Sequence, residues 1–203
     1  MAQSEVLYGG LVLLLMLVGL GLWRFLAARR KEKLHTSFAQ NLQLDLAYLS
    51  PGNFSMYGQY RGYAIKIKSW MLPPQQEKGG QSFTKISIPV TNPHRKILKV
   101  LKAAPDYAVL KNQVAISHPR RVQQEISPAL EMFTNDMIFS SRVLSEEVKI
   151  SIFEAFQGPR AGLMYIEDEE LAMVLPEKLV EENAPAYWQK AMDLLADIKD
   201  ELS

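Results

Sequence analysis

Residues 6–23 read VLYGGLVLLLMLVGLGLW, a stretch of 18 residues without a charged side chain. Past Arg24, the apolar character continues from Phe25 to Ala28. At about 1.5 Å per helical residue, a helix over 6–28 reaches the ~30 Å thickness of the hydrocarbon core of a bilayer. The sequence therefore predicts one N-terminal transmembrane helix.

The residues that flank this segment are those expected at a membrane interface. Tyr8 and Trp23 lie near its two ends, where aromatic belts form. Its C-terminal side carries five basic residues opposed only by Glu32, namely Arg24, Arg29, Arg30, Lys31 and Lys33. By the positive-inside rule, these residues predict that the N-terminus faces out and that the rest of the chain is cytoplasmic. A cleaved signal peptide is the alternative, but residues 1–5 lack the basic residues with which one begins.

The rest of the chain has room for one domain of ordinary size, which can bury a core without disulfides. Leu34, Phe38 and Leu42 recur at a spacing of four, so a basic juxtamembrane helix is expected over 29–44, either as a continuation of the membrane helix or as a separate one. We expect four segments: a short extracytoplasmic N-terminus (1–5), a transmembrane helix (6–28), the juxtamembrane helix (29–44) and a cytoplasmic α+β domain (45–203).

Strand signals come first in this domain. Residues 63–68 alternate between apolar and polar, and 54–60 form the predicted hairpin partner through Arg61-Gly62. Residues 83–90 also alternate, and Pro89 makes them an edge strand or a strand end. Weaker signals predict a turn at 51–53, a mobile loop at 71–82, a helix or a strand at 96–102, and short strands at 107–110 and 114–117.

Helical signals dominate the second half. A helix is expected over 140–157, with Leu144, Val148, Ile152 and Phe156 on one face and a stop at Gly158-Pro159. A hairpin over 161–175 follows, and Pro185 opens a last helix that points Trp188, Ala191, Leu195, Ile198 and Leu202 inward. Strands followed by helices predict an α+β fold with a mainly antiparallel sheet and two or three helices.

The sequence contains no local signature of catalysis. The three histidines (His35, His94 and His118) lie far apart, cysteine is absent, and no P-loop, dinucleotide-binding or nucleophile-elbow motif occurs. The acidic run 167–170 lacks the alternation of a calcium loop and is expected at a solvated hairpin tip. We therefore expect no enzyme, no cofactor and no metal, catalytic or cofactor-binding residue. An enzyme would need Glu154, Asp136 or a histidine buried together in a cleft.

Charge is distributed unevenly along the chain. Residues 1–166 carry 20 Lys/Arg against 11 Asp/Glu, and residues 167–203 carry 3 against 11. Either the two parts pair with each other, or they offer two surfaces to different partners, or they are two solvated faces of one domain.

The most basic part of the domain is 61–102, with nine Lys/Arg against Glu77 alone. We expect a basic sheet surface here, near Tyr57, Tyr60 and Trp70, that includes Arg61, Lys66, Lys68, Lys85, Arg95, Lys96 and Lys99. Aromatic and basic side chains together can bind nucleic acid. For a tethered domain, anionic membrane lipid is the more economical partner, because each basic residue near the bilayer contributes about 1 kcal/mol.

Two functions are compatible with these features. An anchored domain without chemistry acts by contact, which favours a single-pass accessory or scaffold subunit of a larger membrane complex, with membrane lipid and other subunits as partners. The alternative is a peripheral module that uses the basic surface to hold anionic lipid or nucleic acid at the membrane. This organisation is similar to that of many small bacterial membrane proteins, but no motif points to one family.

Overall fold

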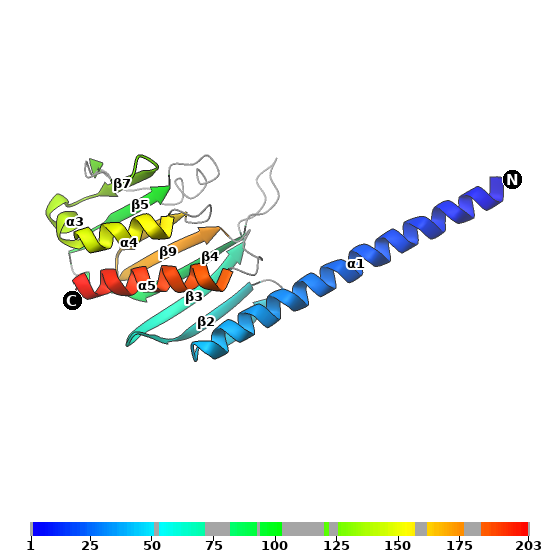
Figure 1. The fold of residues 1–203 in the computed structure, drawn as a ribbon, viewed down its shortest axis with the longest axis horizontal. Helices are drawn as coiled ribbons and strands as arrows, with labels where there is room; N and C mark the ends of the chain where they lie inside the picture. Colours follow the sequence, from blue (N-terminus) through cyan, green and yellow to red (C-terminus); the bar gives the residue numbers. More distant parts are fainter. Residues whose placement is uncertain are drawn as a thin grey trace. The chain divides into compact units, whose positions relative to one another are not determined.

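A computed structural model describes most of the chain: residues 2–50, 53–71, 82–92, 94–102, 120–121, 126–156, 162–176 and 184–202. The chain divides into two compact units, 1–38 and 39–203, which are described separately. Figure 1 shows the long helix α1 of the first unit and the sheet and helices of the second.

Helix α1 (Ala2–Asn41) is unbroken. From Val12 onward it is long and apolar enough to cross a membrane, and it is the one such helix in the described part of the chain. Twelve large apolar side chains between Val12 and Leu26 are each more than half exposed. Such an apolar surface fits lipid better than water.

Helix α1 continues through the predicted juxtamembrane segment to Asn41, with no second start. It ends where Gln43 adopts a positive φ of 55°. The N–H of Leu44 donates to the carbonyl of Ala39 at 2.8 Å, and that of Gln43 donates to the carbonyl of Gln40 at 3.2 Å. This is a Schellman ending, with glutamine where glycine is usual.

Within the described residues, the second unit contains a nine-stranded sheet in the order β1-β2-β3-β4-β9-β8-β5-β7-β6, and each of these pairings is antiparallel. The strands are β1 (Asp45–Ser50), β2 (Asn53–Tyr60), β3 (Tyr63–Met71), β4 (Ser82–Pro89), β5 (Leu98–Lys102), β6 (Arg120–Arg121), β7 (Leu130–Thr134), β8 (Leu163–Glu167) and β9 (Glu170–Pro176). The predicted α+β fold with an antiparallel sheet is confirmed.

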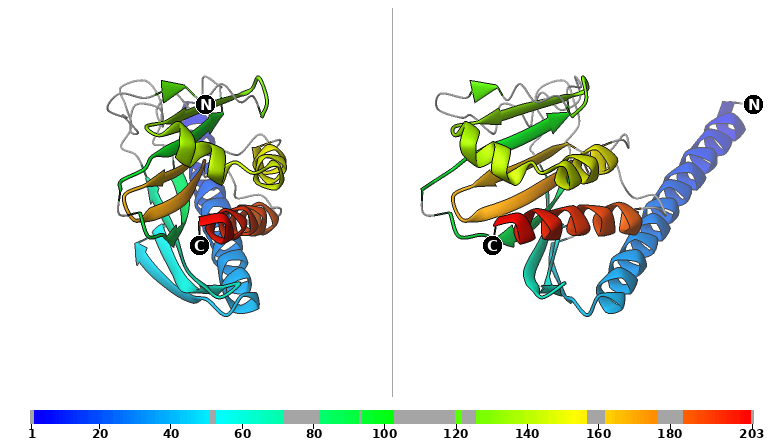
Figure 2. Two further views of the ribbon diagram at one scale, coloured as in Figure 1. Left: turned by 90° about the vertical axis from the view of Figure 1, so that its left-hand side faces the viewer. Right: turned by 60° about the vertical axis from the view of Figure 1, so that its left-hand side comes forward.

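The described part of this unit also contains the helices α3 (Met137–Val143), α4 (Glu146–Phe156) and α5 (Ala184–Leu202). Helices α4 and α5 pack against each other, and α5 contacts β4 and β9. Both lie on the same side of the sheet (Figure 2), which we call the helix face. The rings of Phe54 on β2 and Trp188 on α5 are 5.6 Å apart, which assigns Phe54 to this face.

The helix face carries the core. Side chains alternate along a strand, so every second residue of β2 points to the same face as Phe54. From one of these residues, Met56, the strand pairing defines a row of side chains that crosses seven neighbouring strands. Each of its members is at most 3% exposed: Met56, Ile67, Ile86, Met173, Met164, Val100 and Met132. At Gly58, on the same face, an added Cβ would come within 2.6 Å of the tip of the Leu44 side chain, which would have to shift to make room.

The two predicted hairpins are confirmed, since β2 pairs with β3 and β8 pairs with β9. The β2–β3 turn places Arg61 and Gly62 at positive φ (51° and 84°), as a two-residue turn between twisted strands requires. Strand β4 is internal, so the strand-end reading of Pro89 is right and the edge reading is wrong. The ambiguous segment 96–102 contains β5, a strand.

Two predictions need correction. Strand β1 was not predicted, because DLAYLS at the sheet edge has no clear apolar alternation. The single helix over 140–157 is wrong, because the chain breaks at Leu144–Ser145 between α3 and α4. The Ser145 hydroxyl accepts from the N–H of Val148 at 3.3 Å and starts a new helix.

Some predictions lie outside the described residues. They are those for 72–81, 107–110, 114–117 and Gly158-Pro159, and for Pro51 and Gly52 of the 51–53 turn.

The last helix was predicted correctly, and α5 buries Trp188, Ala191, Leu195 and Ile198, while Leu202 is half-buried. The predicted apolar face of 144–156 is also buried. In each of these stretches, the helical periodicity of the apolar residues is strong enough to predict the buried face from the sequence alone.

Candidate interaction surfaces

The other side of the sheet, which we call the opposite face, carries charged and polar side chains among apolar ones. Its central row runs beside the core row in the same seven strands and contains Tyr57, Lys66, Ser87, Ala172, Tyr165, Lys99 and Phe133. Lys68 on β3 and Lys85 on β4 are cross-strand neighbours on the same face, in the row next to this one. Strand alternation therefore places Lys66, Lys68, Lys85 and Lys99 on one face.

Lys85 is part of a three-residue cluster on this face. Its Nζ lies 2.9 Å from the carboxylate of Glu170 on β9 and 3.4 Å from the Tyr165 hydroxyl on β8. The Tyr165 hydroxyl donates to Glu170 at 2.8 Å. The cluster joins three neighbouring strands.

The cluster also shifts two pKa values away from neutrality. Burial raises the pKa of Tyr165, and its hydrogen bond to Glu170 raises it further. Burial alone would raise the pKa of Glu170, but the hydrogen bonds from Lys85 and Tyr165 outweigh it and hold that pKa below its usual value. Glu170 is therefore ionised and Tyr165 protonated at pH 7. Neither is suited to exchange a proton at that pH.

Lys99 on β5 is buried, with a side chain only 3% exposed. Its Nζ lies 3.0 Å from the Glu167 carboxylate on β8, which is about one-third exposed. A buried ammonium group requires a partner of this kind, because transfer of a charge out of water is costly. Lys99 is thus part of the packing of the sheet.

Arg61, in the β2–β3 turn, reaches α5. One guanidinium nitrogen lies 2.6 Å from Asp197 and the other 3.3 Å from Asp200. The hydroxyl of the neighbouring Tyr60 donates to Asp193 at 2.7 Å. Burial, followed by this hydrogen bond, raises the pKa of Tyr60 to about 12. These contacts hold the hairpin tip against the C-terminal helix.

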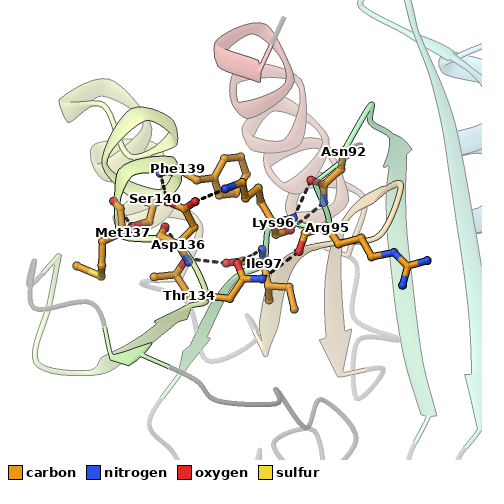
Figure 3. A network of polar contacts seen from close by, with 10 residues as sticks. Asn92, Arg95, Lys96, Ile97, Thr134, Asp136, Met137, Phe139 and Ser140 are labelled. Atoms are coloured by element: carbon orange, nitrogen blue, oxygen red, sulfur yellow. Dashed lines mark hydrogen bonds and ion pairs between the residues drawn. The ribbon is translucent and has the colours of Figure 1, made fainter.

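Lys96 belongs to a polar network where the β4–β5 connection meets the start of α3 (Figure 3). Its ammonium group pairs with Asp136, and this pairing lowers the pKa of Asp136. The other carboxylate oxygen of Asp136 accepts from the N–H of Phe139 at 2.9 Å and caps α3. Asn92 accepts from the Lys96 N–H at 2.9 Å. The Thr134 hydroxyl donates to the Ile97 carbonyl at 2.7 Å. Each of these contacts stabilises a loop or a helix end.

The charge asymmetry of the sequence is therefore in part an internal pairing. Lys85, Lys99 and Arg61 belong to the basic stretch, and their carboxylate partners all belong to the acidic C-terminal part. Four of the seven residues of the predicted basic surface pair with carboxylates, including Lys96. They divide among the opposite face, the β2–β3 turn and the β4–β5 connection. Among the described residues, no carboxylate pairs with Lys66 or Lys68, and Arg95 is exposed in the β4–β5 connection.

The predicted membrane-interface residues all belong to α1. Trp23, Arg24, Arg29, Arg30 and Lys33 are exposed and Lys31 is half-buried, while the side chain of Tyr8 lies outside the described part. The Arg29 guanidinium stacks 5.2 Å above the Phe25 ring, so this charge covers the end of the apolar run.

The described residues contain no group of three metal-ligating side chains. Glu154 is exposed on α4, Asp136 caps α3 and His94 is exposed in the β4–β5 connection, so these three are not gathered at one place. His118 lies outside the described residues. Reasoning from sequence did not identify Glu167, Glu170, Asp197 and Asp200 as partners of the basic stretch. The opposite net charges of the two parts were the available signal.

Comparison with known proteins gives one structural likeness. No protein-family model and no curated protein matches the sequence. Among solved structures, the chain is similar to the crystal structure of the mycobacterial trehalose monomycolate transport factor A, TtfA. The TM-score is 0.53 with 16% sequence identity, and the match covers 87% of this chain and 94% of that chain. At this identity the likeness shows a common fold.

Proposed function

We propose that this chain is a single-pass membrane-anchored accessory subunit, which acts by protein–protein contact within a larger membrane complex. Helix α1 anchors it with the N-terminus outside, and residues 39–203 lie in the cytoplasm, where they contact other subunits. A transport assembly is the complex we favour, because the similar fold belongs to a transport factor.

The proposal rests on the presence, in one chain, of a helix that can span a membrane and a folded domain whose polar groups stabilise the domain itself. The apolar surface of α1 needs lipid or another membrane helix around it. In the second unit, the buried or clustered charges Lys99, Lys85 and Asp136 have structural partners. Contact is thus the mode of action that the described residues best support.

The test is mild detergent extraction of the tagged full-length chain from its native membrane, followed by size separation and mass spectrometry. We expect the chain to migrate with a defined set of membrane proteins. Migration as a lone chain or as a small homo-oligomer would contradict the proposal.

A matched control keeps α1 and replaces residues 42–203 with an unrelated soluble domain of similar size. If the same partners still migrate with this control, α1 makes the contact. If they are lost, the contact involves the cytoplasmic domain. Recovery of the same proteins with a chain in which both the anchor helix and the soluble domain are unrelated would show that the association is nonspecific.

A second candidate function rests on Lys66 and Lys68. The Lys66 ammonium lies 5.6 Å from the centroid of the half-exposed Tyr57 ring, both lysines are half-buried, and no carboxylate among the described residues pairs with either. An anionic lipid headgroup would supply that partner. Charge reversal at Lys66 and Lys68, with Lys85 kept because Glu170 needs it, should then abolish binding of anionic vesicles to the chain in neutral nanodiscs. Unchanged vesicle binding would reject this candidate.

A further inference from the structure

The exposed side of α4 has a composition that helix stability does not explain. The buried side of this helix consists of Val148, Ile152 and Phe156. The side turned away from them, which we call the α4 outer face, consists of Glu146, Glu147, Ile150, Phe153 and Glu154, all exposed.

Two large apolar residues are unusual on such a face. Ile150 is 59% exposed and Phe153 is 40% exposed, and a spacing of three places them side by side on the helix. A solvated helix favours charged or small side chains at such positions, and Ile and Phe are weaker helix formers than Lys, Glu or Ala. Contiguous exposed apolar patches with a polar rim mark protein-interaction sites, and Ile150 and Phe153 form a small patch of this kind.

The rim of the α4 outer face is acidic. Glu146 and Glu147 lie in the first turn, where the helix dipole favours them, and Lys149 pairs with Glu146 at 2.5 Å. Glu154 lies in the last turn, which holds no basic residue and where a negative charge is unfavourable. Glu154 is one turn beyond Ile150, so the charge that is unfavourable for the helix lies next to the exposed apolar pair.

We infer that the α4 outer face docks a Lys/Arg-rich amphipathic segment of an integral membrane partner. This rests on the proposed function, which places the domain in the cytoplasm. There, the loops that adjoin transmembrane helices carry an excess of Lys and Arg. Apolar side chains of such a loop cover Ile150 and Phe153, and its basic side chains pair with Glu147 and Glu154. Anionic lipid is excluded as the occupant because it would meet a net negative rim.

The first test is photo-crosslinking of the full-length chain in native membranes, with benzoylphenylalanine at position 150 or 153. The matched control carries it at Leu49, which is 66% exposed on β1. We expect covalent capture of one integral membrane protein from 150 and 153, through a peptide rich in Lys and Arg, and none from 49. Capture of a second copy of this chain, of lipid only, or of an acidic peptide would overturn the inference.

The second test measures partner recovery after mild extraction. The double variant Ile150→Ser/Phe153→Ser should lower recovery about tenfold, as loss of a central apolar contact does. Glu154→Lys should lower it several-fold, and Leu49→Ser should leave it unchanged. Thermal melts of each variant, matched to the parent, ensure that the change is not one of folding.

The two proposals fail in different ways. If the parent chain migrates with membrane partners, and the α4 variants recover them fully with no crosslink from 150 or 153, this inference is wrong and the accessory function stands. If the parent chain migrates alone, the accessory function fails and the docking site with it.

Discussion

The two faces of the sheet use the same seven strands in different ways. On the helix face, one row of side chains from Met56 to Met132 is almost wholly buried and apolar. The adjacent row on the opposite face, from Tyr57 to Phe133, mixes lysine, tyrosine and serine with apolar residues. On this face, Lys85 and Lys99 are each held by a carboxylate on the adjacent strand.

The difference shows where each kind of stability comes from. Apolar burial on the helix face depends on volume and shape and involves no charge that can titrate or be screened. The ion pairs of the opposite face and of the hairpin turn depend on protonation and screening. Substitutions on the two faces should therefore differ in size and in their response to solution conditions.

The largest effect is expected on the helix face. Ile86→Ala removes a wholly buried side chain and should lower the free energy of unfolding by about 2–5 kcal/mol. Lys66→Ala, on the adjacent strand but on the opposite face, should change it by less than about 0.5 kcal/mol. Urea titration followed by circular dichroism measures both. Equal losses would remove the distinction between the faces.

The next effect distinguishes the two partners of one ion pair. Glu167→Ala leaves the buried Lys99 ammonium without its carboxylate and should cost about 1–3 kcal/mol. Lys99→Met leaves a Glu167 carboxylate that water still reaches, and should cost less than about 1 kcal/mol. The same urea titration compares them. A larger loss for Lys99→Met would mean that Lys99 contributes mainly through its charge.

A pH-dependent effect is expected at Glu170. Its pKa is lower in the folded chain than the ordinary 4.5, so the ionised form stabilises the fold. This contribution is fully present above that value and is lost as the pH falls through the folded pKa. Glu170→Gln should cost about 1 kcal/mol at pH 7, because the pair is partly exposed, and progressively less below about pH 4. A cost that is constant from pH 7 to pH 3 would contradict the assignment.

The smallest effect is expected at the β2–β3 turn. Arg61 and its partners Asp197 and Asp200 are each more than a third exposed, so Arg61→Ala should cost about 0.2–1 kcal/mol. The loss should shrink at high salt, and Lys68→Ala should show none. Thermal melts at low and high ionic strength measure it. A salt-independent loss would indicate packing of the arginine stem instead.

The parts of the fold that the sequence predicted are those specified by neighbouring residues. The apolar run of α1, the alternation of Tyr63 to Lys68 with its Arg61-Gly62 turn, and the periodicity of α5 are all local signals. The break between α3 and α4 was missed, because Ser145 as a cap competes with a helical pattern that continues through it.

The partners of the charges could not be predicted from local pattern. Lys85 and Glu170, or Lys99 and Glu167, meet only because the sheet order places β9 and β8 between β4 and β5. Without that order, the basic residues within 61–102 were interpreted as one surface, whereas four of the seven residues assigned to it have carboxylate partners. The unequal net charges of the two parts of the chain indicated that they could pair, but they did not specify which carboxylate meets which basic residue.

The most direct test of the accessory function is the size of the detergent-extracted chain at two ionic strengths. Raising the ionic strength from about 0.1 M to about 1 M shortens the Debye length from about 10 Å to about 3 Å. A subunit held by a packed membrane helix and apolar contacts should remain in its large assembly under both conditions. A chain that migrates alone at low salt would contradict the account, and one that is released only at high salt would favour a charge-driven membrane module instead.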